Sequence, residues 1–198
     1  MNVRIKFPIT FTAGIFYGGN LQMNNYMVNL SMLTNSMDGA INNIALDRIK
    51  YFIYHEIESS IFINSADTER CAKFIDAGLK ITTIPDEPVD QLIGIMLYYK
   101  LAAITEERLI IDEIEISSSL GDGLVYMHGE HENVDELAVP DWWKTVDLVH
   151  CDTELIEPDE IVTLADLNVW RDLNLDWPSE EEESETGNTV VFILDDTK

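Results

Sequence analysis

Residues 60–104 read SIFINSADTERCAKFIDAGLKITTIPDEPVDQLIGIMLYYKLAAI, and this stretch decides the fold. Short apolar runs at 60–64 and 79–84 are rich in strand-forming residues and predict two strands. Between them, Ser65 stands where a helix N-cap belongs and Gly78 where a left-handed C-terminal cap belongs, which predicts a helix over 66–77. Strands that alternate with helices predict helices layered on a sheet.

The second part of this stretch predicts a buried helix. Asp86-Glu87-Pro88 is a strong helix start, because carboxylates favour the N-terminal end of the helix dipole and proline costs little in the first turn. Apolar residues then recur at three- and four-residue steps, and other apolar residues lie off this stripe, so we expect the central core helix here. The stripe consists of Val89, Leu92, Ile93, Met96, Leu97, Leu101 and Ile104.

Further strands are predicted on both sides of the stretch. Residues 109–116 alternate between apolar and acidic, with one slip of phase that predicts a bulge, and 124–127 would be the partner strand after a turn. At the N-terminus, residues 3–11 and 26–32 alternate and predict a hairpin, with Asn24-Asn25 as a second loop element. Pro8 removes a ladder donor and indicates an edge strand or a bulge.

These patterns predict an α/β or α+β fold, in which two or three helices, one of them over 36–58, pack on a mixed β-sheet. This core domain is expected over residues 1–130. An acidic, tryptophan-containing extension or subdomain is predicted over 131–178, an acidic flexible linker over 179–189 and a terminal strand over 190–198.

The charge of the chain is extreme and unevenly distributed. Of the net charge of −25, residues 1–100 carry −2 and residues 101–198 carry −23. Such a field repels nucleic acid and anionic membranes, and it attracts basic proteins and divalent cations. The longest apolar run, 92–99, is too short to span a bilayer. The two cysteines, Cys71 and Cys151, do not form a disulfide framework, so we expect a cytoplasmic protein.

The charge and the aromatic residues lead to our main functional hypothesis, a non-enzymatic binding or regulatory protein that engages a basic protein surface. Such a protein could act as a nucleic-acid mimic or inhibitor, by analogy with small acidic viral proteins. Large aromatic residues often anchor interfaces, and nearby carboxylates speed association with a basic partner. The interface candidates are Trp142, Trp143, Trp170, Trp177, Asp172 and Asp176, and the alternative for the tryptophans is a second small core.

A metal-dependent enzyme is the first alternative. Imidazole, thiolate and carboxylate groups are the ligands that zinc or another transition metal uses, although the spacing here is not diagnostic. The candidate ligands are His128, Glu130, His131, Glu132, His150 and Cys151. A second carboxylate group, Asp112, Glu113, Glu115 and Asp122, would suit magnesium, but these side chains also fit the solvent face of a strand. The favoured hypothesis requires no cofactor.

The second alternative is a structural subunit of a larger assembly. The run Thr189-Val-Val-Phe-Ile-Leu194 is a strong strand former that follows an acidic linker. It either completes an edge of its own sheet or donates a strand to another subunit, which would produce a homo-oligomer. An unpaired strand of this composition would promote aggregation, so we expect it to be paired.

Overall fold

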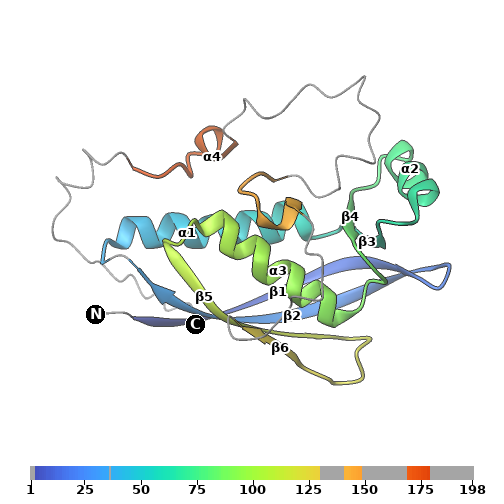
Figure 1. The fold of residues 1–198 in the computed structure, drawn as a ribbon, viewed down its shortest axis with the longest axis horizontal. Helices are drawn as coiled ribbons and strands as arrows, with labels where there is room; N and C mark the ends of the chain where they lie inside the picture. The colour runs from blue at the N-terminus through green and yellow to red at the C-terminus, as the bar shows by residue number, and fades with distance from the viewer. Residues whose placement is uncertain (1–2, 36, 130–140, 149–168, 179–198) are drawn as a thin grey trace, which may run out of the picture.

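The computed structural model describes residues 3–35, 37–129, 141–148 and 169–178 of the chain. It confirms the predicted fold class, a mixed sheet covered by helices (Figure 1). The strands are β1 (Arg4–Tyr17), β2 (Asn20–Thr34), β3 (Ile61–Asn64), β4 (Ile81–Ile84), β5 (Leu109–Ser118) and β6 (Tyr126–Gly129). The helices are α1 (Gly39–Tyr51), the π-helix η1 (Phe52–Ile57), α2 (Thr68–Asp76), α3 (Asp90–Thr105), the 3₁₀-helix η2 (Asp141–Lys144) and α4 (Val169–Asp172).

The six strands form one sheet in the order β4-β3-β1-β2-β5-β6. The long β1–β2 hairpin is antiparallel and turns at Gly18 and Gly19, where both glycines have positive φ. β5 pairs antiparallel with β2 and β6 pairs antiparallel with β5, whereas β3 and β4 add parallel strands beside β1. The parallel pair follows from the strand–helix–strand order of residues 61–84.

Helices cover the two faces of the sheet unequally. The main core lies between one face and the layer of α1, η1 and α3 (Figure 1). α2 packs through Cys71 and Phe74 on a smaller cluster that includes Ile61 and Ile63, while Phe62 belongs to the main core. Because neighbouring strand residues point to opposite faces, α2 covers the other face, at its β3–β4 end. Over β1, β2 and β5 that second face bears no helix of the described chain, and we call it the open face.

α3 is the central core helix, as the sequence predicts. Ten of its sixteen residues are buried, from Ile93 to Thr105. It packs most closely on β5, where a Cβ added at Gly94 would lie 2.7 Å from Ile116 Cγ2. This close approach is the reason that a glycine is needed in the middle of a long apolar helix.

Gly94→Ala is therefore expected to lower the free energy of unfolding by about 1–3 kcal/mol, because a methyl group must be forced between α3 and β5. The measurement is urea denaturation followed by circular dichroism. Gly39→Ala is the matched control, since nothing lies within 4 Å of its added Cβ, and its effect should stay below about 0.5 kcal/mol. Equal effects of the two substitutions would contradict this account of the α3–β5 contact.

Three local details test the sequence predictions. The predicted bulge is confirmed, because the β2–β5 register shifts between Ser31 and Met32. The prediction of a second loop at Asn24-Asn25 is wrong, since both residues lie within β2 and pair with β1. The N-cap of α2 is Asp67 rather than Ser65, because the Asp67 side chain accepts from the Arg70 amide.

The described parts of the 131–178 region pack on the main core. Trp142 and Trp143 of η2 and Trp170 of α4 are members of the main core cluster. η2 lies against α3, while Trp170 stacks edge-on against Tyr51 of α1. In the described part of the chain, no helix is long and apolar enough to cross a bilayer. The expected linker 179–189 and terminal strand 190–198 lie outside the described residues.

Candidate binding surface

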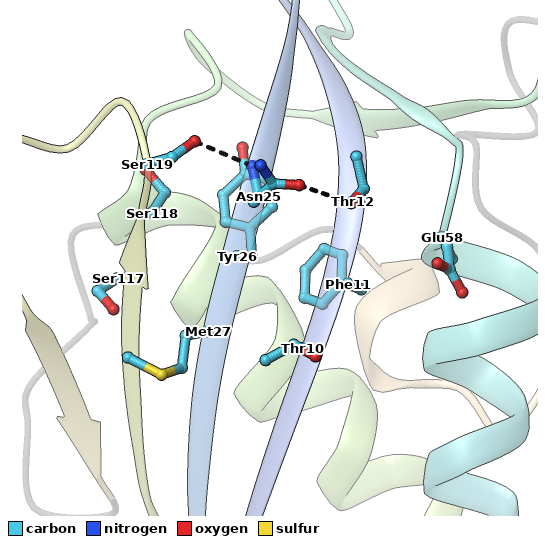
Figure 2. Close-up of a pocket in the computed structure, with 10 residues that line it drawn as sticks. All are labelled: Thr10, Phe11, Thr12, Asn25, Tyr26, Met27, Glu58, Ser117, Ser118 and Ser119. Atoms are coloured by element: carbon cyan, nitrogen blue, oxygen red, sulfur yellow. Dashed lines mark hydrogen bonds between the residues drawn. The ribbon is translucent and has the colours of Figure 1, made fainter.

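The open face of the sheet carries a shallow polar groove of about 440 Å³ (Figure 2). Neighbouring strands contribute side chains in cross-strand rows, Thr10–Met27–Ser117 and Thr12–Asn25–Ser119. Figure 2 shows Glu58 on the β1 side of the groove and the serines of β5 on the opposite side. We call the seven residues Thr10, Thr12, Asn25, Met27, Glu58, Ser117 and Ser119 the hydroxyl groove.

Hydrogen bonds hold the floor of the hydroxyl groove. The Thr12 hydroxyl donates to Asn25 Oδ1 at 2.7 Å, and the Asn25 amide donates to Ser119 Oγ at 3.2 Å. The Ser119 hydroxyl in turn donates to Oδ1 of the buried Asn24 at 2.9 Å. The hydroxyls of Thr12 and Ser119 are thus already bonded to the protein, and the groove offers a polar surface in which Glu58 is the one charged side chain among the described residues.

An acidic row, Asp112, Glu113 and Glu115, lies next to the hydroxyl groove on β5. Glu115 Oε2 accepts from Asn29 Nδ2 at 3.2 Å, and Asp112 Oδ2 accepts from Arg4 Nη2 at 2.8 Å. Lys6 of β1, Ser31 of β2 and Glu113 of β5 lie in one cross-strand row, because Ser31 pairs in register with both of the others. The side chains of the acidic row are partly exposed, as expected for the solvent face of a strand. The row can attract a cationic group, and Arg4 offsets part of its charge.

Many basic side chains of the chain are occupied within the molecule. Several exposed ones form ion pairs with carboxylates nearby, namely Arg4–Asp112, Lys50–Asp47, Arg70–Asp67, Lys73–Glu69 and Arg171–Asp176. Arg48 and Lys100 are almost completely buried. The unmatched charge on the surface is consequently negative, because acids greatly outnumber bases in the sequence.

Arg48 fixes the segment 169–178 to the helical layer. Its guanidinium carbon lies 4.7 Å from the ring centre of Trp170 and 3.9 Å from that of Trp177. Nε donates to Leu175 O at 2.8 Å, and Nη1 donates to Glu106 Oε1 at 2.7 Å. Burial lowers the pKa of Arg48, and the Glu106 carboxylate opposes this effect. Two aromatic faces and an ion pair therefore replace the water that the cation loses.

Lys100 fixes the segment 141–148 in a similar way. Its fully buried Nζ donates to the carbonyl oxygens of Trp142 at 3.0 Å and Thr145 at 2.9 Å, and to that of Asp147. All three N–H groups of the ammonium thus have a carbonyl acceptor. Burial lowers the pKa of Lys100 to about 8, while the Asp147 carboxylate raises it.

The structure brings together only some of the predicted interface residues. Trp142, Trp143 and Trp170 are 6%, 1% and 5% exposed, so these rings lie in the main core and not in a second small one. Trp177 is partly buried over Arg48, while Asp172 is exposed and Asp176 partly exposed. An interface role for these residues stays a prediction, and the described surface presents Asp172 and Asp176 more than the rings.

Of the predicted metal ligands, only His128 lies within the described residues. It is buried on β6, with its ring 4.8 Å from that of Tyr98 and 6.0 Å from that of Tyr99. The other five, Glu130, His131, Glu132, His150 and Cys151, lie outside the described residues. Over the described ranges, no three His, Cys, Asp or Glu side chains gather as a metal would require, and this includes the acidic row with Asp122. A metal site at His128 stays a prediction.

Sequence reasoning missed the two buried cations, although a signal was present. Arg48 follows Ala45 and precedes Ile49 and Phe52, so it occupies a stripe position of α1. Lys100 stands four residues after Met96 and four before Ile104, again on the buried stripe. A cation at a stripe position indicates a buried group with dedicated acceptors.

Comparisons with known proteins bear on the fold alone. No family model matches the sequence, and no curated protein matches it. An uncharacterized protein from Wolinella succinogenes, WS1659, is similar in structure with a TM-score of 0.50 at 11% identity, over 66% of this chain and 99% of that one. Two 6-pyruvoyltetrahydropterin synthases are also similar. The Plasmodium vivax enzyme has a TM-score of 0.43 at 12% identity over 65% of this chain and 97% of its own. The Plasmodium falciparum enzyme has a TM-score of 0.40 at 13% identity, over 66% of this chain and 99% of its own.

Proposed function

We propose that the chain is a non-enzymatic acidic binding protein that engages a basic surface of a partner protein. The observation that carries this proposal is the charge distribution. The second half holds −23 of the net −25, and the chain's own cations are largely buried or paired within the molecule. The remaining negative field speeds encounter with a basic partner and excludes direct binding of nucleic acid.

The open face supports this proposal with a surface of suitable chemistry. The acidic row lies beside the hydroxyl groove, so a basic side chain placed at Glu113 and Glu115 would have neutral hydrogen-bonding groups next to it. Exposed Met27 and Met127 flank the row on the neighbouring strands, and methionine adapts to different partner shapes. A partner that normally binds nucleic acid would fit this combination, which makes the protein a candidate mimic or inhibitor.

The test is the affinity of the purified protein for a panel of basic DNA- and RNA-binding proteins between 50 and 300 mM salt. We expect affinity to fall at least about tenfold from 50 to 200 mM, and duplex DNA to compete for the same partner. Removal of two charges by Glu113→Gln with Glu115→Gln should weaken binding by about three- to tenfold at low salt, if each carboxylate faces a cation.

A control variant with the same change in net charge distinguishes the effect of the acidic row on affinity from the effect of the overall negative charge. Asp47→Asn with Glu69→Gln removes two carboxylates that lie on α1 and α2 and pair with Lys50 and Lys73. This variant should retain nearly all of the affinity. Binding that does not depend on salt would overturn the proposal. Equal losses of affinity in both variants would show that the acidic row is not the contact site and that only the overall negative charge contributes to binding.

A further inference from the structure

Within the described residues, β1 has a long unpaired edge on the side away from β2. Its pairing with β3 covers only Gly14 and Ile15. Between Arg4 and Thr10, no strand of the described residues lies along this side of β1. The side chains of Arg4, Lys6, Pro8 and Thr10 are all exposed. Seven residues of extended backbone therefore form an open edge in the middle of the sheet order.

The direction of the backbone groups along this edge follows from three hydrogen bonds. Ser59 N donates to Thr12 O and Gly14 N donates to Ser60 O, both at 2.8 Å, so even-numbered residues of β1 face away from β2. At the other end, Thr34 N donates to Val3 O at 3.0 Å, so odd-numbered residues face β2. The register has no shift between these points. The outward N–H and C=O groups consequently belong to Arg4, Lys6 and Thr10, and Pro8 adds one carbonyl.

The position of Pro8 agrees with this assignment. If Pro8 faced β2, its missing N–H would remove a hydrogen bond between β1 and β2. Because Pro8 faces outward, the hydrogen bonds between β1 and β2 stay complete. Proline and lysine on an open edge also discourage random pairing with other chains. The edge can therefore accept one short strand at the loss of a single donor.

We propose that residues 189–194 of the same chain, TVVFIL, add to this edge of β1 as a further strand. The run is rich in strand formers and needs a partner for its backbone groups. Its flanks carry Glu180–Glu183, Glu185, Asp195 and Asp196, while the β1 edge carries Lys6 and Arg4, of which Arg4 already pairs with Asp112. Attraction between these acidic flanks and the basic residues of the edge favours this pairing over addition to the acidic β5–β6 end of the sheet.

The length and starting point of the chain allow this docking. Trp177 lies over Arg48 and 5.5 Å from the Arg108 guanidinium. Asn35 N donates to Arg108 O, next to the Thr34–Val3 hydrogen bond at the beginning of β1. The eleven residues from 179 to 189 span up to about 36–40 Å when extended, whereas Arg4 to Thr10 span about 20 Å. The segment can therefore reach the whole edge from its last described anchor.

Residue-resolved amide hydrogen exchange of the full chain tests this proposal. The amides of Lys6 and Thr10 should be protected, and Val191→Asp with Ile193→Asp should raise their exchange rates at least about 100-fold. The amides of Ile5, Phe7 and Ile9 are internal controls, because they face β2 and should stay protected in both proteins. Protection should not change with protein concentration.

Three results would overturn the proposal. Fast exchange at Lys6 and Thr10 in the full chain would show an edge open to water. Protection that survives in the double variant would show that another element covers the edge. Protection that appears only at high concentration, together with a doubled mass in light scattering, would assign the edge to a second copy. None of these results bears on salt-dependent binding to a basic partner, so the two proposals fail separately.

Discussion

Arg48→Met is expected to lower the free energy of unfolding by about 3–5 kcal/mol. The substitution keeps an unbranched side chain in the buried site but removes the cation between Trp170 and Trp177. It also leaves the buried carbonyl of Ile104 and the carboxylate of Glu106 without their Nη1 donor. Both losses act on the same place, the contact of segment 169–178 with α1 and α3.

The measurement is urea denaturation together with tryptophan fluorescence. Arg70→Met is the matched control, because Arg70 also pairs with a carboxylate and lies 4.6 Å from an aromatic ring centre, yet its side chain is 47% exposed. Its effect should stay within about 1 kcal/mol. In Arg48→Met, emission should shift to longer wavelength as Trp170 and Trp177 meet water. Equal stabilities of the two variants would contradict the role of Arg48 as an anchor.

Arg48→Lys distinguishes the contribution of the planar guanidinium group to stability from that of its positive charge. Lysine keeps the positive charge but lacks the planar guanidinium that stacks between two rings and serves Leu175 O and Glu106 together. We expect a loss of about 2–3 kcal/mol, intermediate between the wild type and Arg48→Met. A lysine variant as stable as the wild type would show that charge alone holds the segment.

The periodic elements of this fold could be predicted because their burial is one-sided or complete. β1, β2 and β5 alternate residue by residue, and even the bulge beside Asp112 appears in the sequence as a slip of phase. α3 could be recognised because its apolar stripe is long and has flanking apolar residues. In these cases local pattern and tertiary burial agree.

The features that could not be predicted from the sequence depend on contacts between residues that lie far apart in the chain. Asn24-Asn25 resembles a loop, but Asn24 is buried in β2, where its Oδ1 accepts from Ser119 and from the Leu120 amide. The rings of Trp142, Trp170 and Trp177 lie against buried cations from the other half of the sequence, a contact that the pattern of the tryptophans alone does not indicate. A pattern within one segment does not contain its partner, so the stripe positions of Arg48 and Lys100 indicate burial but not the acceptors and rings that these cations contact.

Lys100→Met is the second substitution expected to have a large effect, a loss of about 2–4 kcal/mol in the free energy of unfolding at pH 7. Methionine fills the space of the lysine stem but cannot donate to the carbonyls of Trp142, Thr145 and Asp147. Because these carbonyls would lack a buried donor, η2 should loosen from α3 and Trp143 should gain exposure. Lys144→Met, on the exposed side of the same segment, should change stability by less than about 0.5 kcal/mol.

The pH dependence of Lys100 distinguishes this anchor from a simple packing contact. Burial lowers its pKa from 10.5 to about 8 in the folded protein, so between these pH values the unfolded chain binds more protons than the folded one. Stability must therefore rise with pH through this window, since neutral Lys100 no longer suffers the loss of its hydration. The difference in unfolding free energy between the wild type and Lys100→Met should widen by up to about 3 kcal/mol from pH 7.5 to 10.5. A constant difference would show that Lys100 keeps its ordinary pKa and that the three carbonyls fully compensate the buried charge.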